Sequence, residues 1–278
     1  FISSSDADGD EVVVTATTKP DWLSVSNNNS NSLSFDGTDD YVEIPSSQSF
    51  EDLVDEITIQ TEFIIEQMPA GESSLIARRD FVGNPYGERH HFQLDIRSNG
   101  SIYFSTMHNQ YDLHTAQVET PPNLIQVGNL YNLSITFDNG LINFYLNGES
   151  VHSEDLGYKE LYPNQHWVNF GRVHRSGGQP FFSEFAGNIS KVTIWDSALS
   201  QEAIQSNISS PINGDEPGLV GYWDFNEGEG STLTDLSGNG NNGTIHGAIW
   251  ESSSSTVLSG TPSHSDGGLH NIVLTAED

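Results

Sequence analysis

The chain has 278 residues and carries 39 acidic against 9 basic side chains, which gives a formal charge of −30. This charge repels nucleic acid and anionic membrane surfaces, so we expect neither as a partner. The absence of cysteine excludes disulfides, thiol nucleophiles and Cys-bound zinc. No segment approaches the roughly 20 apolar residues that span a bilayer, so no membrane insertion is expected.

The first 28 residues combine an acidic cluster with alternating apolar positions. Val12, Val14 and Ala16 alternate as in a strand, and a turn at Pro20 follows. Before them, the acidic residues alternate with other residues as in a calcium-binding loop. Gly9 stands at the fourth position of that run instead of the sixth, so the segment is not an EF-hand.

Residues 32–45, SLSFDGTDDYVEIP, place an acidic turn between two short strands. Asp36, Asp39 and Asp40 lie in this turn beside a glycine, and carboxylate oxygens are ligands that Ca²⁺ prefers. The turn is therefore a candidate cation site. Asp and Gly are also ordinary turn formers, which leaves a purely structural role open.

Further strands follow at the spacing of an antiparallel sandwich. Residues 92–96 alternate inward and reach a second strand through a hairpin at Ser98-Asn99-Gly100. Residues 131–146 repeat the pattern around Asn139-Gly140. The two hairpins predict an antiparallel sheet.

The last third adds one short helix and more strands. A strand ends near Trp195, and Ser200 is the expected N-cap of the helix that follows. Residues 219–250 then predict a strand, a Gly- and Asn-rich stretch and a final strand. A separate strand is expected near the C-terminus at Ile272 and Leu274.

Three segments resemble the laminin G-like jelly rolls of the concanavalin A-like lectin/glucanase superfamily. They are SLSFDGTDDYVEIP, FAGNISKVTIWDSALSQEAIQ and GLVGYWDFNEGEGSTLTDLSGNGNNGTIHGA. The resemblance implies an antiparallel jelly-roll β-sandwich in residues 31–251. It also implies a calcium near the loop after the SFDG strand, held by Asp36, Asp39 and Asp40 with Asn188 and Asp196 as weaker ligands.

The two flanks, residues 1–28 and 255–278, resemble the two halves of one cadherin/Ig-like repeat of large bacterial surface proteins. The first half carries DADGD and PDWLS, and the second carries SGTPSHSDGGLHNIVLTAED. The resemblance implies a jelly roll inserted into a split repeat of a repeats-in-toxin type adhesin, as a monomeric module between flanking repeats. A second cation site is expected at the repeat boundary, from Asp6, Asp8, Asp10 and Glu277.

The arginines and most histidines fall between positions 78 and 175, which marks the expected ligand face. Sugar recognition combines aromatic rings with planar polar groups that bind paired hydroxyls. The loops in or beside this window supply both kinds of side chain. The candidate ligand-binding residues are Asn84, Tyr86, His90, His91, Asn109, Tyr111, Asp112, Arg172, His174, Arg175, Gln179 and Phe181.

We therefore predict a non-catalytic, calcium-dependent lectin at the bacterial cell surface, which binds glycans of host or neighbouring cells. The jelly-roll glucanases carry an ExDxxE strand and the related alginate lyases a QIH strand, and neither string occurs here. A hydrolase or lyase is thus the weaker alternative. A protein- or peptide-binding adhesion module remains open, because the same platform serves both uses.

Overall fold

The computed structural model describes residues 2–4, 13–80, 89–107, 116–158, 160–161, 165–173, 184–261, 263, 266–267 and 270–277. The chain divides into two compact units, one made of residues 1–32 and 250–278 and the other of residues 33–249. It passes from one unit to the other within strands β3 (Leu23–Asp36) and β18 (Ile249–Gly260). No helix among the described residues is long and apolar enough to cross a membrane.

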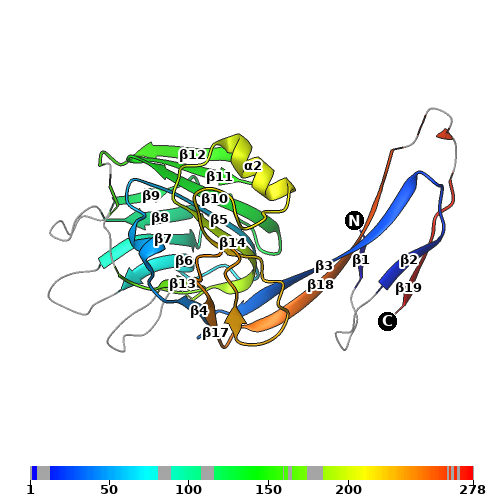
Figure 1. The fold of residues 1–278 in the computed structure, drawn as a ribbon, viewed down its shortest axis with the longest axis horizontal. Coiled ribbons are helices and arrows are strands. Elements are labelled where there is room, and N and C mark those ends of the chain that lie inside the picture. Colours follow the sequence, from blue (N-terminus) through cyan, green and yellow to red (C-terminus); the bar gives the residue numbers. More distant parts are fainter. Residues whose placement is uncertain are drawn as a thin grey trace. The chain divides into compact units, whose positions relative to one another are not determined.

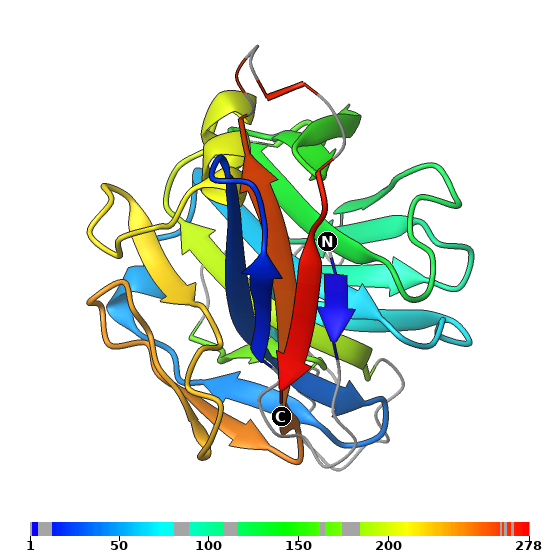
Figure 2. The same cartoon turned by 90° about the vertical axis from the view of Figure 1, so that its right-hand side faces the viewer.

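The smaller unit is built from both flanks of the chain. Strand β2 (Val13–Thr18) pairs antiparallel with β19 (Val273–Glu277), and β1 (Ile2–Ser4) pairs with β18 (Figure 2). The Trp22 ring packs edge-on against His270 at 5.6 Å between centroids. Segments more than 200 residues apart thus share one unit, and their assignment to the cadherin/Ig-like repeats stays a prediction.

The larger unit is a sandwich of two antiparallel sheets (Figure 1). In the first sheet β3 is followed by β14, β5, β10, β11 and β12, and β15 also pairs with β14. The second sheet has the order β16-β17-β4-β13-β6-β7-β8-β9. The predicted jelly-roll fold is confirmed. The strands of the first sheet after β3 are β5 (Glu56–Ile65), β10 (Leu130–Asp138), β11 (Leu141–Leu146), β12 (Glu149–Asp155), β14 (Ala186–Trp195) and β15 (Leu219–Trp223).

The second sheet runs through the middle of the chain and closes with its last part. Its strands are β4 (Tyr41–Ile44), β6 (Glu72–Asp80), β7 (Arg89–Arg97), β8 (Ile102–Thr106), β9 (Ala116–Glu119), β13 (Val168–Phe170), β16 (Thr232–Leu233) and β17 (Gly243–His246). Side chains of one parity, such as Phe92, Leu94 and Ile96, are fully buried between the sheets. The opposite parity forms the outer face, because successive strand residues point to opposite sides.

The hairpin predictions are confirmed. Asp138 pairs with Leu141, and the two residues between them, Asn139 and Gly140, have φ of 48° and 103°. Positive φ at both central positions gives the turn twist that suits a two-residue hairpin, which explains the Asn-Gly sequence. Strands β7 and β8 likewise pair around Gly100, which has φ of 75°.

Helix α2 (Gln201–Ser209) covers the outer face of the first sheet (Figure 1). Ser200 caps it by accepting a hydrogen bond from the Ala203 amide, as predicted. The Asn207 amide donates to Gln60 Oε1 on β5 at 2.8 Å, and Gln205 donates to the Gly148 carbonyl between β11 and β12. A one-turn helix, α1 (Gln48–Glu51), lies between β4 and β5.

Asp235 organises the Gly- and Asn-rich stretch between β15 and β17. Its carboxylate is buried and accepts hydrogen bonds from the amides of Tyr222, Ser237 and Asn241 at 2.8–3.0 Å. We expect Asp235→Ala to lower the free energy of unfolding by about 3 kcal/mol or more, since three amides lose their acceptor. Urea titration tests this, with the exposed Asp215→Ala as control. Equal stability of both variants would contradict it.

Candidate functional site

The acidic turn joins β3 to β4. Carboxylate oxygens of Asp36, Asp39 and Asp40 all lie within 4.8 Å of one another. Two of these carboxylates also stabilise the turn by hydrogen bonds to its backbone. Asp36 Oδ1 accepts from the Thr38 amide at 2.7 Å, and Asp40 Oδ2 accepts from the Asp36 amide at 2.8 Å. Asp36 and Asp39 are exposed, whereas Asp40 is buried. Three acids thus meet at one edge of the fold.

The electrostatics of this turn favour a cation. Burial raises the pKa of Asp40, and the negative charges of Asp36 and Asp39 raise it further, against the hydrogen bond from the Asp36 amide. A cation among the three carboxylates would relieve both costs. Ca²⁺ takes six to eight oxygen ligands in irregular geometry, so a turn with three carboxylates fits it.

Two glycines bring other strands close to the turn. Gly247, with φ of 75°, follows β17, and a Cβ there would collide with Asp40 Oδ1. Gly171, with φ of 84°, follows β13, and a Cβ there would come within 3.3 Å of the Asp40 carbonyl oxygen. Both positions require glycine, because the conformation and the space exclude a side chain. The turn is therefore packed against the ends of β13 and β17.

A stack of three planar groups stands directly beside the acidic turn. Tyr41 and His246 are stacked with 4.3 Å between ring centroids and 13° between planes. The Arg172 guanidinium lies over the Tyr41 ring at 3.0 Å and within 3.6 Å of Glu43 Oε2. Each member of the stack is next in sequence to Asp40 or to one of the two glycines packed on it: Tyr41 follows Asp40, Arg172 follows Gly171 and His246 precedes Gly247.

The outer face of the second sheet is polar, and much of it is buried. Gln93 Nε2 donates to Asp95 Oδ2 at 2.5 Å, and Arg79 donates to Gln93 Oε1. Burial raises the pKa of Asp95 to about 7, and the charge of Glu72 adds to this. Arg97 pairs with Glu72 at 2.8 Å. We call this surface the polar sheet face; its described members are Glu43, Ser74, Ala77, Arg79, Gln93, Asp95, Tyr103, Ser105, Gln117 and Asn169.

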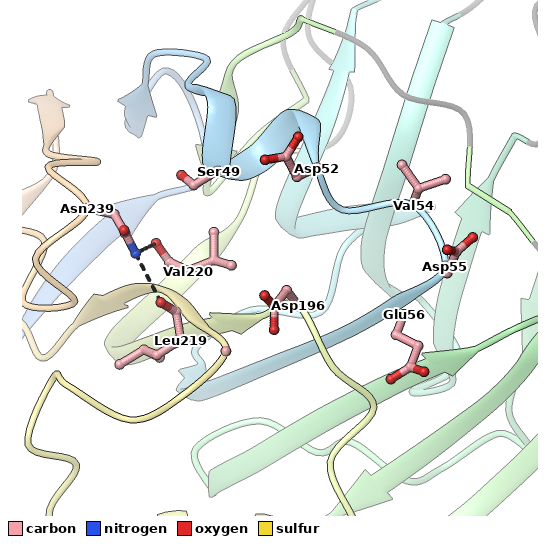
Figure 3. A pocket seen from close by; sticks show the side chains of 10 residues that line it. Ser49, Asp52, Val54, Asp55, Glu56, Asp196, Leu219, Val220 and Asn239 are labelled. Carbon is pink, nitrogen blue, oxygen red and sulfur yellow. Dashed lines mark hydrogen bonds between the residues drawn. The ribbon is translucent and has the colours of Figure 1, made fainter.

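A pocket of about 520 Å³ opens at one end of the first sheet (Figure 3). Asp52, Asp55, Glu56 and Asp196 line it, but among the described residues they form no group close enough to share one metal ion. The Glu56 carboxylate accepts from the Ala198 amide, and Asp52 accepts from Gln48. The carboxylates of Glu56 and Asp52 thus stabilise the local backbone and side-chain structure.

Comparison with protein families assigns the fold. Residues 36–205 match the family model described as the concanavalin A-like lectin/glucanases superfamily. The chain belongs to this superfamily. The match includes the acidic turn and ends within helix α2. No curated protein matches the sequence.

Solved structures share this concanavalin A-like fold at low sequence identity. A Bacteroides ovatus protein described as carbohydrate-binding aligns with a TM-score of 0.59 and 18% identity, over 80% of this chain and 59% of that one. The chain thus spans less than two thirds of that relative. A Ruminococcus gnavus sialidase module, CBM40, solved with α2,3-sialyllactose, aligns with a TM-score of 0.50 and 16% identity over 65% and 97% of the two chains. At these identities the likeness shows the fold.

The structure brings together only part of the predicted calcium ligands of this concanavalin A-like domain. Asn188 pairs with Ser34 on β3, two residues along the strand from the Asp36 pair. The prediction that Asp196 belongs to the calcium site at the acidic turn is wrong. It follows the far end of β14, about 30 Å from Asp36 by the rise per residue, and lines the pocket of Figure 3.

Two predicted ligand-binding residues have described side chains. His91 is fully buried, and its ring contacts the Leu53 carbonyl oxygen and lies 3.4 Å from Arg78. It therefore lies in the interior, not on the expected surface. Arg172 belongs to the stack on Tyr41, and burial lowers its pKa. Val168 on β13 pairs with Arg78, the neighbour of His91, and Arg172 follows four residues later. About 13 Å of extended chain therefore separates Arg172 from this buried pair.

The other predicted residues fall outside what the structure describes. The predicted ligand-binding residues in this group are Asn84, Tyr86, Asn109, Tyr111, Asp112, His174, Arg175, Gln179 and Phe181. Asp6, Asp8 and Asp10 are outside it too, as are the side chains of His90 and Glu277. Their roles stay predictions.

Sequence reasoning missed the partners that only the strand order assembles. Tyr41 lies within the segment that revealed the acidic turn, but its stacking on His246 depends on β17 pairing with β4. Asn169 and Asp95 of the polar sheet face were missed as well. For Asp95 the signal was the polar residue at every second position of β7, which predicts an outer face but not its burial.

Proposed function

We propose that the larger unit is a non-catalytic, calcium-dependent glycan-binding module. Its membership of the concanavalin A-like lectin/glucanase superfamily supports binding of carbohydrate, as do its carbohydrate-binding structural neighbours. The observation that carries the calcium dependence is the cluster of Asp36, Asp39 and Asp40 carboxylates. These residues would hold the ion, which would neutralise the turn and fix its shape.

The position of the turn links calcium to the ligand surface. Asp40 precedes Tyr41 in β4, so an ion that orders Asp40 also orders the stack of Tyr41, Arg172 and His246. An aromatic ring beside a planar guanidinium suits a sugar, because the ring packs against C–H groups and the guanidinium binds hydroxyl oxygens. Calcium would therefore strengthen glycan binding by ordering the end of the second sheet.

The proposal assigns no catalysis to the module. Retaining hydrolysis needs two carboxyl groups about 5–5.5 Å apart, one of them an ionised nucleophile. On the polar sheet face Asp95 is fully buried, and its Oδ2 is hydrogen-bonded to Gln93. A carboxyl group buried in this way is not placed to act as the ionised nucleophile. New reducing ends from an oligosaccharide panel would contradict it and favour a hydrolase.

We further propose that the module acts at the surface of a bacterial cell as part of an adhesin. The smaller unit, formed by both flanks, is the arrangement expected for a repeat that holds an inserted domain. Flanking repeats of the same adhesin would be its neighbours, and glycans on host or neighbouring cells its targets. The cadherin-like resemblance of residues 1–28 and 255–278 supports this context.

A glycan array probed in calcium and again in chelator tests the proposed function. We expect binding to a set of glycans in calcium and a loss of at least about tenfold in chelator. Absence of glycan binding under both conditions, together with specific capture of one cell-surface protein, would contradict the lectin proposal. That result would favour a protein-binding adhesion module.

A further inference from the structure

We infer that Arg78 and His91 form an acid-sensitive latch, which holds residues 46–53 against the second sheet while His91 is neutral and releases them when His91 takes up a proton. The segment connects β4 to β5 and contains helix α1. This inference goes beyond the proposed function, because neither residue of the latch belongs to the acidic turn or to the stack beside it.

The two side chains of the latch are fully buried and in contact. Arg78 lies on β6, and the register shift between Arg78 and Arg79 falls beside His91 on β7. Arg78 Nη1 lies 3.4 Å from His91 Nδ1. Burial lowers the pKa of Arg78 only to about 10, so the guanidinium stays charged at neutral pH. His91 Nδ1 therefore has a permanent cation beside it.

The contacts of His91 determine which of its ring nitrogens carries the hydrogen. Nε2 contacts the Leu53 carbonyl oxygen, and a carbonyl only accepts, so Nε2 is the donor. Nδ1 then has the lone pair that accepts from Arg78 Nη1. A second proton on the ring would have to bind Nδ1 and would point an N–H at a guanidinium N–H. Because two cations repel strongly in a buried site, the closed latch keeps His91 neutral.

The latch binds the segment through its backbone carbonyls. Arg78 Nη1 donates to the Phe50 carbonyl, and His91 Nε2 donates to the Leu53 carbonyl. Arg78 Nη2 also lies 3.4 Å from Ser46 Oγ. Helix α1 has four residues, and a helix of one turn is not stable by itself, so its position depends on such contacts. Phe50 and Leu53 are also buried, which keeps the open form rare at neutral pH.

The other groups around the latch do not remove the repulsion. Glu51 of α1 is the described acid whose charge acts on Arg78, and it raises the pKa of Arg78 against the effect of burial. It is half-exposed, so water screens its charge. Arg78 Nε donates to the His166 carbonyl at 3.2 Å, and this neutral acceptor is the same in both protonation states of His91. A proton on His91 thus adds a second positive charge to a buried cation.

Opening of the latch returns His91 to water, where a histidine has an ordinary pKa of about 6.5. The open form therefore binds a proton below this pH, whereas the closed form does not. The latch is fully stable above about pH 6.5, and the ratio of open to closed forms rises about tenfold from pH 7.5 to pH 5.5. Ser49 and Asp52 of the segment line the pocket of Figure 3, so acid would displace one of its walls.

Hydrogen exchange of the full chain, measured by mass spectrometry at pH 7.5 and pH 5.5, tests the inference. After correction for the intrinsic rate, peptides covering residues 46–53 should exchange about tenfold faster at pH 5.5 in the wild type. In His91→Gln the corrected rates should be equal, because a neutral amide keeps a donor and an acceptor but gains no proton. His152→Gln, at a half-buried histidine of β12, is the matched control and should behave as the wild type. Asp95 is present in all three proteins, so its titration cancels in the comparison.

An equal pH dependence of this segment in the wild type and in His91→Gln would overturn the inference. An acid effect of the same size in peptides of β10 would also overturn it, because the whole sandwich would then be losing stability. A second measurement needs no variant: NMR of the histidine ring nitrogens should show a neutral His91 with its hydrogen on Nε2 at pH 7.5. A charged ring, or a hydrogen on Nδ1, would contradict the latch.

Discussion

Calcium is expected to raise the midpoint of thermal unfolding, and Asp39→Asn is expected to remove most of this effect. An ion that binds only the folded protein at a hundred times its dissociation constant contributes about 2.7 kcal/mol. In chelator, Asp39→Asn should be as stable as the wild type or more so, because it removes a charge that raises the pKa of Asp40. Differential scanning calorimetry with and without calcium measures both effects.

The matched control for this comparison is Asp138→Asn, an exposed acid at the end of β10. It should retain the full calcium shift. The predicted second cation site at Asp6, Asp8 and Asp10 would stabilise both variants equally, so the difference between them reports the acidic turn alone. An equal calcium shift in Asp39→Asn and Asp138→Asn would contradict calcium binding by the turn.

Asp95→Asn is expected to stabilise the protein at pH 8 by about 4 kcal/mol. Burial raises the pKa of Asp95 from 3.8 to about 7, so the folded state holds a proton that the unfolded chain has released. The wild type therefore loses stability as the pH rises from about 4 to about 7. An asparagine at this position keeps the shape without the charge, so this loss is absent from the variant.

The groups around Asp95 fix the sign of this effect. Glu72 on β6 raises the pKa, whereas Ser74, Gln93 and Arg79 lower it by a smaller amount than burial raises it. Urea unfolding of the wild type, Asp95→Asn and Asp138→Asn between pH 4 and pH 8 isolates the contribution. A constant difference between the wild type and Asp95→Asn across this range would contradict the raised pKa.

The sequence predicts the fold of the larger unit well because its signals are local. Alternating apolar residues, the Asn139-Gly140 turn and the Ser200 cap each act within a few positions, and each is found in the structure. The acidic turn is local as well, since Asp36, Asp39 and Asp40 lie within five residues. Their mutual approach therefore needs no knowledge of strand order.

The site predictions from the sequence fail where segments distant in the chain come together. Asp196 belongs to a matched motif, but β14 is ten residues long and carries it away from the turn. A register shift between Arg78 and Arg79 opposite β7 accompanies the inward position of His91, which periodicity alone does not predict. The stack of Tyr41, Arg172 and His246 requires the order β17-β4-β13, which the sequence does not reveal.

Calcium-dependent glycan binding is tested most directly by calorimetric titration of one array-positive glycan into the wild type, in calcium and in chelator, and into Asp39→Asn in calcium. We expect binding to the wild type in calcium and at least about tenfold weaker binding in the other two titrations. Equal affinity in all three would contradict a calcium-dependent lectin organised by the acidic turn.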